Sequence, residues 1–139
     1  MAKVVLISCV SKKLSHESKA KDLYVSPLFK KELEYARRLK PDKIFILSAK
    51  YGLLKLDEKV NPYDKTLNKM SSEEIKKWAD SVLNQLKEVS DLKNDEFIFL
   101  AGSKYRKFLL PHIKHYKVPM QRMKIGKQLK WLSERIRNE

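Results

Sequence analysis

Glycine, cysteine and histidine are scarce in this sequence, and no hydrophobic run is long. The 139 residues include three glycines, one cysteine and three histidines. A single cysteine excludes an internal disulfide and is typical of a cytoplasmic protein. The scattered histidines and the cysteine have no zinc-ligand spacing, so we expect neither a metal nor another cofactor. No apolar segment approaches the roughly 20 residues of a membrane-spanning helix, so we expect no membrane partner.

Positive charge is present in excess, and it is concentrated toward the two ends of the sequence. The formal net charge is +14. Residues 32–102 are electrically balanced, whereas residues 1–31 carry +5 and residues 103–139 carry +9. If the fold brings the ends together, they form one positive face, for which DNA or RNA is the natural partner. The alternative is a lysine-rich chain from a hot environment, which explains the mixed charges of the middle but not the basic tail.

Signals for strands and helices alternate along the chain. Three continuous apolar runs, Val4–Ser8, Lys43–Ser48 and Glu96–Ala101, are typical of strands that are buried on both faces of a parallel sheet. A weaker extended segment covers Tyr116–Met120. This alternation predicts one α/β domain over residues 1–139, in which helices on both faces of a mostly parallel sheet of about four strands make three layers.

Helical patterns separate the predicted strands. Ser26, which precedes a proline, is typical of a helix start. Ser71 and Glu74 have the spacing of a capping box at the start of a second helix. Ser103 is a candidate cap for a short helix, and the last helix is expected to begin near Ile125, with that side chain facing inward.

Residues that could bind a ligand follow each of the three predicted strands. In open α/β sheets, ligands bind beyond the carboxyl ends of the strands, where small residues and exposed backbone N–H groups allow close approach. The alternative is that the cysteine is a small buried residue, the lysines belong to a solvated turn and the glycines only shape turns. The candidate ligand-binding residues at these strand ends are Cys9, Lys12, Lys13, Ser48, Lys50, Tyr51, Gly52 and Gly102.

A long stretch without a clear helix or strand pattern, Ala49–Thr66, separates the second strand from the capped helix. Loops of this length in a compact domain are usually functional. Tyr51 and Tyr63 can stack on a base, and Asp57 and Asp64 can supply carboxylates for acid–base chemistry. Asp64 is the preferred candidate because a nearby proline stiffens its backbone. The alternative is a surface loop that leucine side chains hold in place.

Several blocks of the sequence resemble an uncharacterised family of small bacterial, archaeal and phage proteins. They are ISCVSKK, KDLYVSPLF, ILSAKYGLL with NPYDKTL, LAGSKYRKFL and IGKQLKWL, and they cover nearly the whole chain. The central block is also similar to the LSGLYG…D…PY block of the YaaA family, whose members are linked to DNA binding and to protection from oxidative damage. Related domains occur beside enzymes that modify or exchange bases in DNA and tRNA.

The resemblance implies functional positions but no particular reaction. The positions that match the shared blocks are Cys9, Lys12, Lys13, Tyr24, Ser26, Ser48, Tyr51, Gly52, Asp57, Pro62, Tyr63, Asp64, Gly102, Tyr105 and Gly126.

These observations predict a nucleic-acid-associated protein that holds a base or nucleotide at the C-terminal edge of a parallel sheet. In the enzymatic form of this hypothesis, a glycosylase-like or base-modifying enzyme, Tyr51 or Tyr63 stacks on the base and Asp64 or Asp57 supplies the charged group. The alternatives are a non-catalytic DNA- or RNA-binding module and a small-nucleotide hydrolase or transferase. The remaining candidate contacts to nucleic acid are Tyr105, Lys127 and Lys130.

Overall fold

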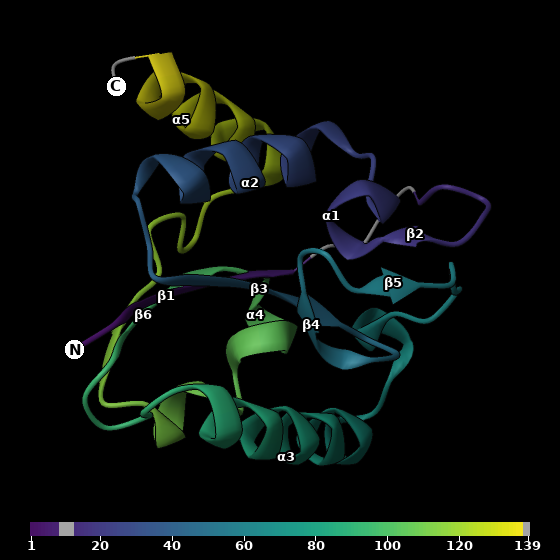
Figure 1. Cartoon of the computed structure of the whole chain (residues 1–139), viewed down its shortest axis with the longest axis vertical. Helices are drawn as coiled ribbons and strands as arrows, with labels where there is room; N and C mark the ends of the chain where they lie inside the picture. Colours follow the sequence, from purple (N-terminus) through teal and green to yellow (C-terminus); the bar gives the residue numbers. More distant parts are fainter. Residues whose placement is uncertain (9–12, 138–139) are drawn as a thin grey trace.

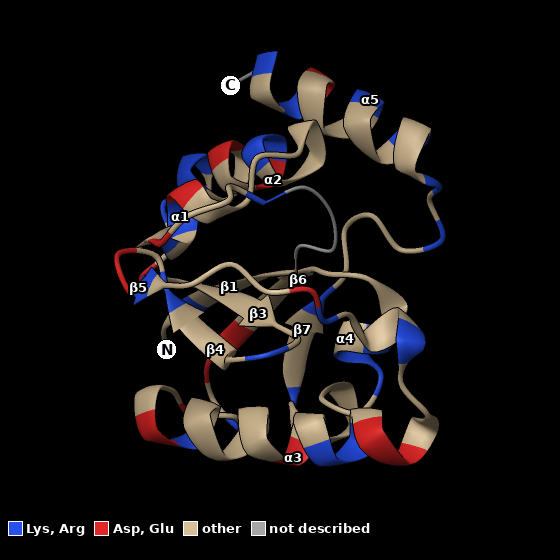
Figure 2. Ribbon diagram, turned by 90° about the vertical axis from the view of Figure 1, so that its right-hand side faces the viewer, with Lys and Arg blue, Asp and Glu red and all other residues tan. Residues whose placement is uncertain are grey.

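A five-stranded sheet separates two layers of helices (Figure 1). The computed structural model describes residues 1–8 and 13–137. Helix α3 (Ser72–Val89) covers one face of the sheet, and α2 (Pro27–Arg38) and α5 (Ile125–Arg137) lie together on the other (Figures 1 and 2). The spatial order of the strands is β4 (Gly52–Lys55), β3 (Lys43–Ser48), β1 (Lys3–Ser8), β6 (Glu96–Leu100) and β7 (His115–Lys117).

The predicted three-layer α/β class is confirmed, with five strands in place of four. Within the described residues of the five-stranded sheet, β4 runs antiparallel to β3, while the other pairs are parallel. A separate two-stranded antiparallel sheet joins β2 and β5. The weak fourth strand is present but shorter than expected. The remaining elements are short: β2 (Ser18–Lys19), β5 (Lys59–Val60), α1 (Ala20–Leu23), α4 (Ser103–Arg106) and the 3₁₀ turns η1 (Leu67–Lys69) and η2 (Leu110–His112).

Residues 4–7 of the central strand β1 are fully buried, and the strand pairs with β3 on one side and β6 on the other. Val5, for example, lies opposite Ile44 of β3 and Ile98 of β6. Successive side chains of a strand point to opposite faces, so a continuous apolar run supplies both helical layers. Val4 therefore joins the core beneath α3, whereas Val5 joins the core beneath α2.

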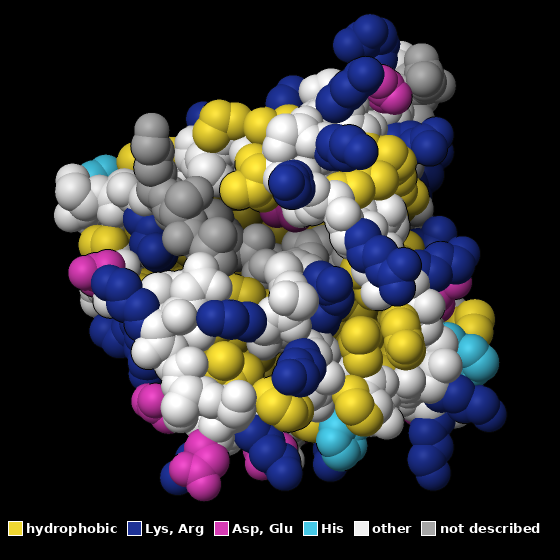
Figure 3. Space-filling view, turned by 180° about the vertical axis from the view of Figure 1, so that it is seen from behind, with side chains coloured by type: hydrophobic (Ala, Val, Ile, Leu, Met, Phe, Trp, Pro, Cys, Tyr) yellow, Lys and Arg dark blue, Asp and Glu magenta, His cyan; other side chains and the backbone are white. Residues whose placement is uncertain are grey.

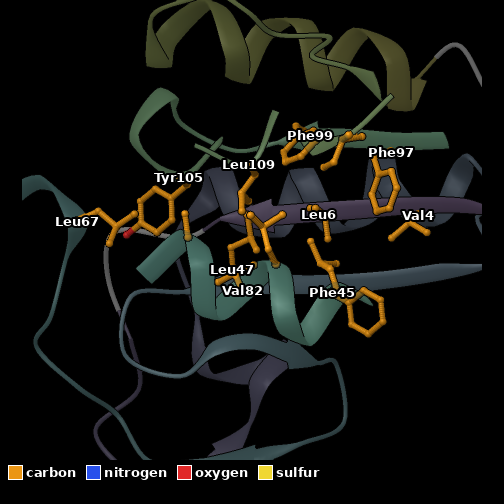
Figure 4. Packing of buried hydrophobic residues seen from close by; sticks show 14 of the residues in the cluster. Val4, Leu6, Phe45, Leu47, Leu67, Val82, Phe97, Phe99, Tyr105 and Leu109 are labelled. Carbon is orange, nitrogen blue, oxygen red and sulfur yellow. The ribbon is translucent and has the colours of Figure 1, made fainter. Parts of the chain in front are cut away.

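The core between the sheet and α3 consists of aromatic and aliphatic side chains from β1, β3 and β6, from α3 itself and from the segments around η1 and α4 (Figure 4). Leu6, Phe97 and Phe99 in this layer are at most 1 % exposed. Complete burial of such a side chain contributes about 1.5–3 kcal/mol. The indole N–H of Trp78 on α3 donates to the backbone oxygen of Ser48 at 2.9 Å, which ties the helix to the end of β3.

The layer formed by α2 and α5 brings the C-terminal segment onto the N-terminal half of the chain. Leu132 is the buried residue of α5, and the ring of Trp131 packs edge-on against Tyr35 of α2 with centroids 5.1 Å apart. The expectation that Ile125 faces inward is wrong, since this side chain is 62 % exposed. The first turn of α5 borders an open cavity instead of packing on a neighbouring element.

Local capping explains where two of the helices begin. The hydroxyl of Ser26 accepts from the N–H of Phe29 at 3.2 Å, as expected for the start of α2. Ser71 and Glu74 form the expected capping box of α3, and these hydrogen bonds lower the pKa of the Glu74 carboxyl. The expectation for Ser103 is wrong, because Gly102 takes the cap position of α4 and no side chain caps this short helix.

The stretch Ala49–Thr66 is less irregular than the sequence suggests, because it contains β4 and β5. Gly52 makes the reversal from β3 into β4 possible: its φ is +75°, a conformation that costs a residue with a side chain roughly 1–2 kcal/mol. A Cβ atom at this position would lie 2.4 Å from Oε1 of Gln85. The same oxygen accepts from the N–H of Leu53 at 2.9 Å. Sequence periodicity missed β4 because the strand is short.

We expect Gly52→Ala to lower the free energy of unfolding by about 1–2 kcal/mol, because alanine strains the backbone and displaces Gln85. Urea titration followed by circular dichroism measures this loss. Gly126→Ala is the matched control, since a Cβ atom there meets nothing within 4 Å. Equal stability of the two variants would contradict this role of Gly52.

Candidate functional site

The carboxyl ends of three parallel strands meet at one edge of the sheet, as the sequence predicted. Ser8 ends β1, Ser48 ends β3, and Gly102 follows β6 by two residues. The N–H of Gly102 donates to the hydroxyl of Ser8 at 3.1 Å, so one side chain bridges the ends of β1 and β6. Small and hydroxyl-bearing residues therefore line the edge at which ligands of open α/β sheets bind.

A cluster of hydroxyl groups lies beyond the end of β3. The hydroxyl of Ser48 donates to the hydroxyl of Tyr63 at 2.9 Å, and that of Tyr24 lies 2.7 Å from the same Tyr63 oxygen. Ser48 also accepts from two backbone N–H groups of the following turn, those of Lys50 and Tyr51. The fold thus brings together two residues that the sequence singled out, Ser48 and Tyr63, and places both in a structural network.

Cations lie over the aromatic rings of this cluster. The ammonium of Lys13 is 4.5 Å from the ring centre of Tyr63, and that of Lys50 is 5.2 Å from the ring centre of Tyr51. The two tyrosine rings meet edge to face with centroids 5.7 Å apart. An arrangement of rings and cations of this kind is typical of surfaces on which bases and phosphates bind.

The two candidate carboxylates, Asp57 and Asp64, lie in different surroundings. Asp57 is exposed and forms an ion pair with Lys21 at 3.3 Å. Asp64 is also exposed, and it forms neither an ion pair nor a hydrogen bond with another residue of the described ranges. Because Asp64 directly follows Tyr63, it is the nearer of the two to the hydroxyl cluster along the chain.

The other candidates from the sequence are dispersed. Tyr105 is buried, and its ring meets Trp78 edge-on at 5.5 Å, which is a packing role. Lys127 and Lys130 are exposed on α5. Cys9 and Lys12 lie outside the described residues.

Lys50, Tyr51 and Gly52 line a cavity of about 660 Å³ against α3. Lys65 and Lys77 line the same cavity, which adds cations to this part of the surface. The residues after β3 therefore face a shallow basic hollow on the α3 side of the molecule.

A second cavity, of about 500 Å³, opens where β1 and β6 lie side by side. The chain passes from β1 to β3 through α2 on one face, and from β3 to β6 through α3 on the other (Figure 1). The two crossovers diverge between β1 and β6, and ligands of open α/β sheets bind at such a switch point. The walls come from the ends of β1 and β6, from α2, α4 and α5, and from the loop between β7 and α5. We call this space the switch-point cavity.

Glu32 of α2 is the most unusual residue of the switch-point cavity. Its side chain is 3 % exposed, and Oε1 has no hydrogen-bond partner among residues 1–8 and 13–137. Burial raises the pKa of this carboxyl well above its ordinary value, because the ionised form loses its hydration. A buried polar group without a partner is costly to the fold, so a ligand that pairs with it is a natural explanation.

Three cations line the same cavity: Lys104, Arg106 and Arg122. Arg106 is partly buried, donates to the backbone oxygen of Ala101 at 2.6 Å, and has a pKa lowered by desolvation. Within the described part of the chain, none of the three pairs with a carboxylate. Figure 3 shows Lys and Arg side chains around a hollowed part of one face. These cations are available to an anionic ligand.

The loop that closes the switch-point cavity has an unusual backbone at Arg122. Its φ is +69°, a conformation that costs a residue with a side chain about 1–2 kcal/mol. On the neighbouring turn of α5, the side-chain amide of Gln128 donates to the backbone oxygen of Met123 at 2.8 Å, which fixes the loop to the helix. This strained and anchored turn holds Arg122 at the lining of the cavity.

Sequence reasoning missed Glu32, although its pattern was readable. Glu32 is spaced three residues after Phe29 and one before Leu33, within the buried stripe of α2. A charged residue inside an apolar helical stripe is unusual, because its burial must be compensated. Arg106 and Arg122 gave no such signal, since basic residues are frequent throughout the C-terminal segment.

No group of three potential metal ligands occurs within residues 1–8 and 13–137. Over the same ranges, every helix is too short or too polar to cross a lipid bilayer.

The raised pKa of Glu32 makes stability depend on pH. Below the ordinary carboxyl pKa of 4.5, Glu32 is neutral in the folded and the unfolded chain, so its ionisation does not weaken the fold. The free energy of unfolding falls as pH rises above this value, because the unfolded chain then ionises a carboxyl whose ionised form the fold disfavours. Each unit of pKa shift corresponds to about 1.4 kcal/mol. We expect the melting temperature of Glu32→Gln to exceed that of the wild type by a margin that widens from pH 4 to pH 7, measured by scanning calorimetry. A margin that stays constant between pH 4 and pH 7 would contradict the burial of an uncompensated carboxyl.

No curated protein and no solved structure matches the chain. The comparison with protein families finds a match over residues 4–134, which include the hydroxyl cluster, the switch-point cavity and most of α5. The chain therefore belongs to the family described as a Family of unknown function (DUF6884).

Proposed function

We propose that this protein associates with nucleic acid and holds a base or nucleotide at the C-terminal edge of its sheet. The observation that carries the proposal is the gathering of cations at this edge: Lys13 and Lys50 lie over aromatic rings, and three further cations line the switch-point cavity. Cations beside rings, at the end of a parallel sheet, provide contacts both to phosphates and to base faces.

The charge balance of the whole molecule supports the same proposal. Side chains of residues 1–8 and 13–137 form just three ion pairs, which involve Lys21, Arg38 and Lys117. An ion pair cancels one charge of each sign, so the net charge of +14 is unaffected, and most Lys and Arg side chains of these ranges have no carboxylate partner. A surface of this kind attracts polyanions, because their condensed counterions are released on binding.

The similarity of the LSAKYGLL and NPYD blocks to the YaaA family gives independent support, since members of that family are linked to DNA binding. Those blocks contribute Ser48, Tyr51 and Tyr63, which meet in the hydroxyl cluster. The switch-point cavity then provides the enclosed space for a single base or nucleotide, and the exposed lysines of α5 extend the basic surface next to it.

Charge reversal on α5 tests the polyanion contact. We expect the triple variant Lys124→Glu, Lys127→Glu and Lys130→Glu to bind single-stranded oligonucleotides more weakly, because these exposed lysines lie just before α5 or on it, and the first turn of α5 lines the cavity. The slope of log affinity against log salt should flatten by about one unit for each lost phosphate contact. Fluorescence anisotropy over a salt series measures both quantities.

The matched control reverses three exposed lysines of the opposite layer, Lys76, Lys87 and Lys93. Both triple variants have the same net charge, so a purely non-specific effect of charge changes them equally. Equal slopes for the two variants would show that α5 does not face the polyanion.

In its enzymatic form the proposal is a base-modifying or glycosylase-like reaction on a base that stacks on Tyr51 or Tyr63, with the adjacent Asp64 as the acid–base group. Asp64→Asn should reduce turnover about 100-fold or more and leave oligonucleotide affinity unchanged. Chromatography of the released or altered base gives the turnover. Asp57→Asn is the control, because Asp57 is engaged with Lys21.

Absence of turnover in the wild type would leave the non-catalytic binding module as the function. Equal turnover in Asp64→Asn and the wild type would instead exclude Asp64 as the acid–base group. Turnover of free nucleotides without oligonucleotide binding would instead support the small-nucleotide hydrolase or transferase.

A further inference from the structure

We infer that the switch-point cavity selects a guanine base, whose N–H edge pairs with Glu32 and whose attached phosphate is bound by Arg106 and its neighbouring cations. This inference deepens the proposed function and rests on it. It assigns a ligand to a cavity whose buried carboxyl has no partner among the described residues.

Glu32 points to a ligand with hydrogen-bond donors. Its Oε1 is buried and unpaired within residues 1–8 and 13–137, although the cavity beside it is large enough for a base and its sugar. An apolar side chain at this position of the α2 stripe would avoid the cost of burying a carboxyl. The Glu32 side chain lies instead at the edge of the sheet where the parallel strands end, which is where ligand-binding groups of α/β proteins are found.

Guanine fits this group better than the other bases. Burial favours the neutral form of the Glu32 carboxyl, but a ligand that donates two hydrogen bonds to it stabilises the ionised form. An ionised carboxylate accepts through two oxygens and donates nothing. Guanine presents two adjacent donors, the ring N1–H and the 2-amino group, which match the two oxygens. Adenine and cytosine place an acceptor beside their amino group, and uracil and thymine offer one N–H between two carbonyls. Only guanine therefore satisfies both oxygens of Glu32 at once.

The rest of the cavity provides the other contacts of a nucleotide. Leu28, Val118 and Met120 give apolar surface for the faces of the base. Arg106 and Arg122 line the same cavity and, within the described residues, have no carboxylate partner, so they can bind a phosphate. No ion pair within 4.0 Å joins Glu32 to these cations among the described residues, so each can contact a different part of the ligand.

Wild-type selectivity is the first test. Isothermal titration calorimetry with GMP, inosine monophosphate and AMP uses ligands that differ only at the base. Inosine monophosphate keeps N1–H but lacks the 2-amino donor. We expect GMP to bind at least about tenfold more tightly than either of the others, because a ligand that lacks a donor leaves a buried acceptor unpaired.

Substitution of Glu32 is the second test. Glu32→Gln keeps the shape but replaces one acceptor with a donor, and it should abolish the preference for GMP. Glu32→Leu should lose GMP binding and raise the melting temperature, a combination that a structural role of Glu32 does not produce. Glu34→Gln, at an exposed position of the same helix, should leave the preference intact.

A competition experiment distinguishes a guanine that belongs to a nucleic-acid strand from a free guanine nucleotide. A labelled single-stranded oligoadenylate that contains one guanine is compared with the same strand containing inosine. Displacement by GMP and a stronger signal for the guanine strand would place a base of the polymer in the cavity, whereas binding of free GMP alone would identify a mononucleotide site.

Equal affinities for GMP, inosine monophosphate and AMP, or a GMP preference that survives in Glu32→Gln, would overturn the assignment of guanine. The proposed function would then still stand if the α5 triple variant changes the salt slope. Loss of that salt effect would contradict the polyanion contact, even in a protein that binds GMP selectively.

Discussion

The pairing of β1 with β3 and β6 is the interaction on which the rest of the structure depends. Val4, Val5, Leu6 and Ile7 are fully buried, so both sheet faces and both helical layers meet at this one strand. Parallel pairing on each side also fixes where the neighbouring strands end. Ser8, whose hydroxyl binds the backbone after β6, therefore belongs both to the sheet and to the switch-point cavity.

The polar groups at this edge differ in how completely the fold satisfies them. Tyr63 and Ser48 are held by one another and by their neighbours, whereas Oε1 of Glu32 has no partner within the described part of the chain. Satisfied groups rigidify a fold, and an unsatisfied one reduces its stability. Proteins retain unsatisfied buried polar groups of this kind mainly at functional sites. For this reason the switch-point cavity is a stronger candidate for ligand binding than the hydroxyl cluster, whose polar groups are hydrogen-bonded to one another.

Much of the fold followed from sequence patterns, but the most distinctive part of the site did not. Continuous apolar runs and capping residues are local signals, so the central strands and the start of α3 were predictable. The strand that begins at Gly52 was missed because four residues carry too little periodicity, and Ile125 was misplaced because helical spacing cannot show which turn lacks a neighbour. The role of Glu32 becomes visible only from its tertiary burial beside residues of β1, β6, α4 and α5, which lie far from it along the chain.

The packing of α5 has a consequence for how the molecule opens. This helix contributes one buried residue, and it is held to α2 by contacts such as that of Trp131 with Tyr35. An element with so little burial separates from a fold at a lower free energy than a central strand does. Because Ile125 and Gln128 line the switch-point cavity, sub-global opening of α5 would uncover Glu32 while the sheet remains intact. Amide hydrogens of α5 would then exchange faster than those of β1, and an occupied cavity would slow them.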